Sequence, residues 1–142
     1  MSTVLRAYGT NFDVDAYLQG CTLPVCAVKR RGEPVYPLSQ PSGRRNEKSG
    51  INVDASTADF DDFSGQLEET IVFLQTNSEQ LKRLSKWPGI ESLTLDFGIK
   101  RRDAAAQCDY FPPELLRLAG ALEIGIELSQ YSIEDDENSE SS

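Results

Sequence analysis

The chain of 142 residues contains no histidine, and this absence excludes several kinds of chemistry. Without an imidazole there is no Ser-His-Asp or Cys-His catalytic group, no histidine metal ligand, and no side chain whose ordinary pKa suits acid–base catalysis near neutral pH. No glycine-rich phosphate-binding loop follows a strand pattern. The sequence therefore contains no motif that fixes a reaction, and it predicts no cofactor and no metal site.

Cysteine is also scarce. The three thiols, Cys21, Cys26 and Cys108, are odd in number and widely spaced, unlike the cysteines of a disulfide framework. A zinc site would need a tighter pair and a fourth ligand. The chain has no apolar run long enough to span a bilayer, and its first residues lack the basic and apolar segments of a secretory signal. These absences predict a cytoplasmic protein with no membrane partner.

Basic residues are fewer than acidic ones, 14 against 23, which gives a formal net charge of -9. Five of the acids fall among the last ten residues, where most of the others are serine. Such a segment has too little apolar surface to offset the entropy lost on ordering. We therefore expect a single α+β domain over residues 1–132 and an acidic disordered tail over residues 133–142.

The longest helical pattern runs from Phe60 to Trp87. Apolar residues recur in it at helical spacing, but the pattern breaks near Thr76, which forms a capping-box pattern with Glu79. Pro88 and Gly89 then end it. We expect two consecutive helices here, with one apolar face packed on the core.

Shorter patterns of strand and helix surround this stretch. Strands are expected over residues 3–9, 25–30, 51–56, 93–100 and 122–129, further helices over 14–19 and 112–122, and an exposed loop over 37–49. The strands at 93–100 and 122–129 alternate most cleanly between apolar and polar residues, which is typical of antiparallel sheets with one solvated face. The order predicts an α+β two-layer sandwich with a mainly antiparallel sheet, helices packed on one face, and a ferredoxin-like first part.

Polar residues on these two strands form one candidate surface. Asp96, Glu123 and Glu127 all project from the polar sides of the strands, and they would converge if the strands were neighbours. Gly98 and Gly125 would keep the same face flat, which suits a partner surface as well as a substrate site. Because the alternation places these residues on a solvated face, we favour a partner surface over a catalytic carboxylate pair.

Basic residues gather in three clusters that hold nine of the fourteen lysines and arginines. The clusters are Lys29, Arg30 and Arg31; Arg44, Arg45 and Lys48; and Lys100, Arg101 and Arg102. Two of them end strands and one lies in the expected loop, so they would contact phosphates if they met at one edge of the sheet. Aromatic residues that could stack on bases are not interleaved with the clusters, which weighs against nucleic-acid binding. The competing interpretation is that these charges lie on edge strands and deter aggregation.

Residues 111–119 read Phe-Pro-Pro-Glu-Leu-Leu-Arg-Leu-Ala and run into the strand pattern that reaches Tyr131. An opening strand, a short helix over 13–20, an Arg-Gly-Glu-Pro turn at 31–34 and the helical stretch over 67–84 accompany this motif. Together these features resemble a bacterial family catalogued as domain of unknown function 4279, and the resemblance covers most of residues 3–131. Because that family is itself uncharacterised, the resemblance implies no activity and no residue roles.

The function that these patterns favour is a small cytoplasmic protein-interaction module without catalytic activity. It would hold a protein partner with the polar sheet face or with the basic strand ends. An immunity protein that masks a toxin is one concrete version, by analogy of size and charge alone. The alternative is a nucleic-acid-associated protein that uses the basic strand ends, and a carboxylate-based enzyme comes third.

Overall fold

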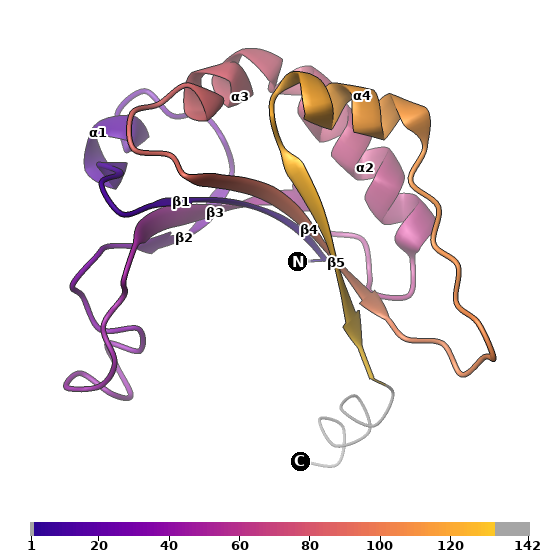
Figure 1. The fold of residues 1–142 in the computed structure, drawn as a ribbon, viewed down its shortest axis with the longest axis horizontal. Helices are drawn as coiled ribbons and strands as arrows, with labels where there is room; N and C mark the ends of the chain where they lie inside the picture. Colours follow the sequence, from indigo (N-terminus) through magenta and orange to yellow (C-terminus); the bar gives the residue numbers. More distant parts are fainter. Residues whose placement is uncertain (1, 133–142) are drawn as a thin grey trace.

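The computed structural model describes residues 2–132 and arranges them as a five-stranded sheet with four helices on one face (Figure 1). The strands are β1 (Thr3–Gly9), β2 (Val25–Lys29), β3 (Ser49–Ser56), β4 (Ser92–Lys100) and β5 (Gly125–Tyr131). The helices are α1 (Val14–Leu18), α2 (Phe63–Thr76), α3 (Ser78–Ser85) and α4 (Pro113–Ala121). The predicted α+β sandwich with helices on one face is confirmed.

The strand order in the sheet is β2-β3-β1-β4-β5. The first four strands pair antiparallel with each neighbour, and with the intervening helices they follow the predicted ferredoxin-like βαββαβ order. β5 differs, because α4 returns the chain to the same end of the sheet and β5 pairs parallel with β4. The inference from clean alternation to an antiparallel pair is therefore wrong for β5. Alternation reports that only one face of the sheet is covered, and it does not report strand direction.

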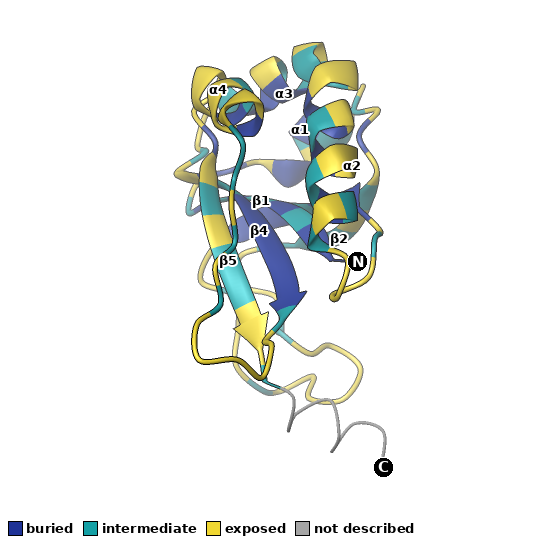
Figure 2. Cartoon of the chain, turned by 90° about the vertical axis from the view of Figure 1, so that its right-hand side faces the viewer, coloured by how far each residue is buried: buried dark blue, intermediate teal, exposed yellow. Residues whose placement is uncertain are grey.

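The core lies between the sheet and the helices, where Figure 2 shows the buried residues concentrated. Leu5 of β1 and Leu95 of β4 are fully buried there, together with Leu74 of α2 and Leu81 of α3. The residues that alternate with them on the strands point to the uncovered face. One face of the sheet thus supplies stability, and the other is available for contacts.

The predicted break in the long helical stretch is present, but its mechanism differs from the predicted capping box. Asn77 separates α2 from α3, and its side-chain amide donates to the carbonyl of Phe73 at 3.0 Å. α3 has no side-chain cap hydrogen bond at its N-terminus. α2 begins at Phe63 because the carboxylate of Asp62 accepts from the backbone N–H of Gly65 at 2.9 Å.

Residues 30–48, hereafter the arm, project from the sheet on the side away from the helices (Figure 1). The arm contains the predicted exposed loop, and backbone hydrogen bonds tie its two halves together. Val35 donates to Arg44 at 2.8 Å, Asn46 donates to Glu33 at 2.8 Å, and Pro34 forms an isolated bridge with Arg45. The arm is therefore an irregular hairpin with a defined shape.

The sequence also predicts a tail over 133–142, and those residues lie outside the part of the chain that the structure describes. Within residues 2–132, no helix combines the length and hydrophobicity that crossing a membrane requires.

Candidate binding face

The uncovered face of the sheet is concave in Figure 1, and we call it the concave face. The arm bounds it at one end, and the final residues of β4 and β5 bound it at the other. Alternate residues of the strands supply its side chains, among them Arg6, Tyr8, Lys29, Asn52, Asp96, Glu127 and Ser129. Three places carry the chemistry: an ion-pair network at the centre of this face, a cavity at the arm, and a second cavity beside the last residues of β4.

An arginine holds together the two carboxylates of the central network. Arg6 lies 2.6 Å from Asp96 through one guanidinium nitrogen and 3.4 Å from Glu127 through the other. Ser129 adds a hydrogen bond from its hydroxyl to Asp96 at 2.6 Å. Asp96 and Glu127 meet because β4 and β5 are neighbours, with these two residues in register.

This network matches a structural role better than a catalytic one. Asp96 is only 5% exposed, and its charge is balanced by Arg6 and a hydrogen bond. Catalytic carboxylate pairs need access for a substrate, whereas the cavities at the two ends of the sheet are lined by other residues. The arrangement therefore fixes three strands to one another across the concave face.

Glu123 does not join this network, which corrects its predicted place on the polar side of the last strand. It lies in the turn between α4 and β5 with a left-handed backbone, φ 58°. Its N–H donates to Gly120 at 3.0 Å, and the N–H of Ile124 donates to Ala119 at 2.9 Å. Glu123 therefore belongs to the C-terminal turn of α4, although its side chain fits the alternating pattern of a strand. β5 begins only at Gly125.

The two glycines on the predicted face have different surroundings. Gly98 is buried beneath Phe60 and Tyr131, whose rings lie 5.4 Å apart at their centroids. A Cβ added at Gly98 would lie 3.0 Å from the Phe60 ring and 3.3 Å from the Tyr131 ring. The expected flat surface at Gly98 is therefore wrong, because an aromatic pair covers it. Gly125 is exposed at the start of β5 and leaves that part of the face open.

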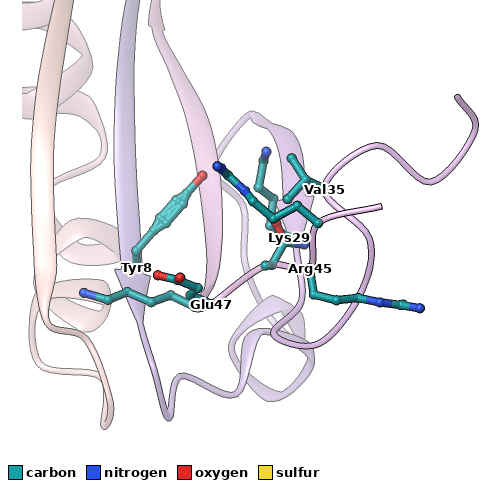
Figure 3. Close-up of a pocket in the computed structure, with 8 residues that line it drawn as sticks. Tyr8, Lys29, Val35, Arg45 and Glu47 are labelled. Atoms are coloured by element: carbon teal, nitrogen blue, oxygen red, sulfur yellow. The ribbon is translucent and has the colours of Figure 1, made fainter. Parts of the chain in front are cut away.

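Two of the three basic clusters supply residues to one cavity. A cavity of about 340 Å³ lies between Tyr8 and the arm, and Figure 3 shows the Tyr8 ring extending from β1 towards the arm. Its basic lining residues are Lys29, Arg44, Arg45 and Lys48, with Glu47 as the acidic one. We call this space the arm cavity.

The other two residues of the first cluster face different partners. Arg30 forms an ion pair with Asp15 just after the start of α1 at 2.8 Å, and this contact lowers the pKa of Asp15. The guanidinium of Arg31 donates to the carbonyl of Thr10 at 3.4 Å. Both residues therefore attach the base of the arm to the domain.

Within the arm cavity, hydrogen bonds fix two of the lining side chains. The Tyr8 hydroxyl donates to Asn52 at 2.6 Å, and burial raises the pKa of Tyr8. Lys48 lies 3.1 Å from Glu91, whose carboxylate also accepts the backbone N–H of Thr10 at 3.0 Å. These hydrogen bonds, with that of Thr10 the strongest, lower the pKa of Glu91 to about 2.

Lys29, Arg44 and Arg45 contribute uncompensated charge to the arm cavity. Within residues 2–132, none of the three forms an ion pair with a carboxylate, and Arg45 donates only to the carbonyl of Gly32 at 3.3 Å. The cavity is thus a concave space with four cationic side chains, of which only Lys48 is held by an acid. Such a space attracts an anion.

The third basic cluster lies at the opposite end of the sheet, so the three clusters do not meet at one edge. Across the paired strands, Lys29, Gly50 and Tyr8 are aligned with Ser92, the first residue of β4. Lys100 is the last residue of β4 and therefore lies at the other end of the sheet. The third cluster rims a second cavity, of about 270 Å³. The apolar lining residues are Phe60, Phe63 and Ile99, and the basic ones are Lys100, Arg101 and Arg102.

Metal ligation has no support in the described part of the chain, where no three His, Cys, Asp or Glu side chains cluster as a metal site would need. Cys21, Cys26 and Cys108 are free thiols. The residues that the sequence analysis missed are Arg6 and Tyr8. Their signal was the alternation within β1, where they lie opposite the apolar side chains of the core.

The chain was compared with protein-family models, with curated proteins and with solved structures. The resemblance to domain of unknown function 4279 stays a prediction. None of the three comparisons gives a match.

Proposed function

We propose that the protein is a non-catalytic, cytoplasmic protein-interaction module that binds an acidic protein partner on its concave face. The observation that carries the proposal is the exposure of large apolar side chains on the arm. Leu38 is 98% exposed and Tyr36 is 59% exposed, on a segment that backbone hydrogen bonds hold in shape. Tyrosine and arginine are enriched among the residues that dominate binding energy in interfaces, and an exposed leucine beside them adds apolar contact area.

Charge complementarity favours an acidic partner. The arm carries Arg44 and Arg45, and the other end of the concave face carries Arg101 and Arg102. The chain as a whole is acidic, with a net charge of -9, so these arginines form local basic groups on an acidic protein. A partner with acidic patches would meet attraction on this face and repulsion elsewhere.

Aromatic side chains at the far end extend the same surface. Phe60 and Tyr131 are each 46% exposed, and their rings pack against each other. The pair is supported by Gly98 beneath it. A partner that spans the concave face would therefore contact an apolar group with neighbouring arginines at both ends, with the paired charges of Arg6, Asp96 and Glu127 between them.

The test compares two exposed apolar residues on opposite faces of the molecule. Leu38 lies on the arm, and Val72, which is 58% exposed, lies on α2. The tagged protein and its Leu38→Glu and Val72→Glu variants are used to capture proteins from the native lysate at low and high salt, with mass spectrometry of what is retained. We expect a defined acidic partner that the wild type and Val72→Glu retain and that Leu38→Glu loses.

Two results would count against this proposal. One is a partner that Val72→Glu loses and Leu38→Glu retains, since binding would then use the helical face. The other is a protein that remains monomeric and captures nothing that responds to Leu38→Glu. If Leu38→Glu does abolish binding, photo-crosslinking from position 38 to the purified partner distinguishes a direct contact at position 38 from an effect of the substitution on folding.

Nucleic acid is the alternative partner, and the convergence of two basic clusters at the arm cavity is the observation that favours it. The third cluster lies at the other end of the concave face, so a nucleic-acid strand would have to cross that face to reach all three basic clusters. Binding to a generic duplex should then fall steeply with salt, and it should weaken when Arg101 and Arg102 are changed to Ala. Binding that ignores salt or these two substitutions would remove this alternative.

A further inference from the structure

We propose that the arm cavity is a binding site for the phosphate group of a small molecule. The inference shares Arg44 and Arg45 with the partner surface proposed above, but it does not require that partner, because it concerns a cavity at the arm and not the exposed apolar residues Tyr36 and Leu38. It rests on the shape of the cavity, on its excess of cationic groups, and on the way in which those groups are held.

The cationic side chains come from two segments that the fold brings together. Lys29 ends β2, and Arg44, Arg45 and Lys48 lie on the returning half of the arm. The two halves of the arm are joined by backbone hydrogen bonds from Gly32 to Asn46 at 3.0 Å and from Asn46 to Glu33 at 2.8 Å. The side-chain amide of Asn46 also donates to the carbonyl of Arg30 at 3.2 Å. The two chain segments that carry the positive charges are thus held together by the backbone before any ligand arrives, which reduces the entropy lost on binding.

The number of charges favours phosphate over a single carboxylate. Four cationic side chains line the cavity, against the one carboxylate of Glu47. Glu91 compensates Lys48 from outside the lining, which leaves Lys29, Arg44 and Arg45 without an ion pair to a carboxylate among the described residues. A carboxylate ligand brings one negative charge, whereas a phosphate monoester brings roughly 1.5 to 2 and three acceptor oxygens. A phosphate therefore balances more of this positive charge than a single carboxylate does, and arginine suits its geometry.

The walls of the cavity also provide an apolar contact. The Tyr8 ring forms one side and Val35 lies in the lining on the arm. The volume of about 340 Å³ falls within the range of small-molecule sites, roughly 300–1,000 Å³. An organic group attached to the phosphate would have room beside the Tyr8 ring. The second cavity is a weaker candidate, because Asp61 and Asp103 also line it and Arg102 is paired with Asp109 at 3.3 Å.

The experiment measures binding of defined probes to the full chain by isothermal titration calorimetry at near-physiological salt. The probes are inorganic phosphate, pyrophosphate and phenyl phosphate, with citrate as a carboxylate of comparable charge and a short single-stranded oligonucleotide as a polymer. We expect the phosphate probes to bind and citrate to bind at least about tenfold more weakly. Phenyl phosphate that binds more tightly than inorganic phosphate identifies an organic ester as the ligand, and the reverse order identifies the free ion; both support a phosphate site.

Matched variants locate the site. Lys29→Gln and Arg44→Gln should each weaken binding of pyrophosphate about tenfold or more, since each removes a charged hydrogen-bond donor. Arg101→Gln removes the same charge at the other end of the sheet and should leave binding unchanged within about twofold. Thermal unfolding of each variant, followed by circular dichroism, checks that the fold is intact.

Four results would overturn the inference: no binding of any phosphate probe, citrate binding as tight as pyrophosphate, equal weakening by Arg101→Gln, or a preference for the oligonucleotide over every small probe. None of these results depends on the acidic protein partner. Conversely, a partner lost with Leu38→Glu says nothing about phosphate. The two proposals can therefore fail separately.

Discussion

Arg6 on β1 lies 2.6 Å from Asp96 on β4, and the Asp96 side chain is only 6% exposed whereas that of Arg6 is 43% exposed. The carboxylate is therefore almost removed from water, and the guanidinium that balances it stays at the surface. A buried charge without a partner is costly, because the protein interior solvates it poorly. The pair links adjacent strands and, through Glu127 at 3.4 Å, reaches β5 as well.

Removing the cation should therefore cost more than removing both charges. We expect Arg6→Met to lower the free energy of unfolding by about 2–3 kcal/mol, less than for a fully buried pair because Arg6 is partly solvated. Asp96→Asn in the Arg6→Met background should restore part of this loss, since it removes the unpaired charge while a side-chain oxygen still accepts from Ser129. Urea unfolding of the wild type, both single variants and the double variant measures the coupling. If Asp96→Asn changed the free energy of unfolding equally in the wild-type and Arg6→Met backgrounds, Arg6 would not be balancing the charge of Asp96.

Gln66 on α2 should be a second sensitive position, because it is completely buried and forms three hydrogen bonds. Its side-chain oxygen accepts from Thr3 at 3.0 Å, and its side-chain nitrogen donates to the carbonyls of Asp59 and Gly98 at 3.0 and 2.9 Å. Gln66→Leu removes all three bonds and leaves the buried Thr3 hydroxyl without its acceptor, so we expect a loss of about 2–3 kcal/mol in urea unfolding. Gln75→Leu, at an exposed position of the same helix, should change stability by about 0.5 kcal/mol or less. Similar effects of the two changes would show that burial of the amide is unimportant.

Local pattern predicted the elements of this fold well, because each strand and helix has one apolar face. The alternation at 93–100 describes β4 closely, with Leu95 and Phe97 in the core and Asp96 on the other side. The parallel direction of β5 was not predictable from alternation. It depends on which neighbour the strand joins after α4, and the same one-sided burial arises in either direction.

The candidate site was predicted less completely, because it depends on contacts between distant segments. Asp96 and Glu127 were expected to converge and do so, but Arg6 between them comes from a strand whose pattern was too short to single it out. Gly98 gave no local sign that Phe60 and Tyr131 would cover it. The arm cavity likewise requires Arg44 to fold back over the sheet face next to Tyr8, which the composition of the loop does not reveal.

Glu91 should make stability depend on pH in the acidic range. The hydrogen bond from the Thr10 N–H and the contact with Lys48 lower the pKa of Glu91 to about 2 from an ordinary value of 4.5. A carboxyl group with a lowered pKa in the folded state stabilises the protein above its unfolded pKa, and this contribution is lost as the pH falls through the folded pKa. The stability advantage of the wild type over Glu91→Gln should therefore be full above about pH 4.5 and shrink towards pH 2. Thermal midpoints of both proteins across this range provide the measurement, and an advantage that stays constant down to pH 2 would contradict it.

Gly50 on β3 should not tolerate a side chain, because the Tyr8 ring of β1 packs directly over it. A Cβ at Gly50 would lie 2.2 Å from a ring carbon of Tyr8, which is too close for the ring to remain in place. We expect Gly50→Ala to lower the free energy of unfolding by about 1–3 kcal/mol through overpacking. Gly120→Ala in α4 is the matched control: nothing lies within 4 Å of its added Cβ, and alanine should stabilise the helix by about 0.5–1 kcal/mol.

The same collision predicts a rescue. In a Tyr8→Ala background the ring is gone, so Gly50→Ala should cost almost nothing further, and urea unfolding of the four proteins measures this coupling. An undiminished cost in that background would mean that the strand itself, and not the ring, rejects alanine at position 50. Because Tyr8 also lines the arm cavity, Gly50→Ala should in addition weaken any binding of phenyl phosphate there, while Gly120→Ala should not. If Gly50→Ala lowers both stability and phenyl phosphate binding, and the stability cost disappears when the Tyr8 ring is removed, then Gly50 on the neighbouring strand determines the shape of the arm cavity through the position of that ring.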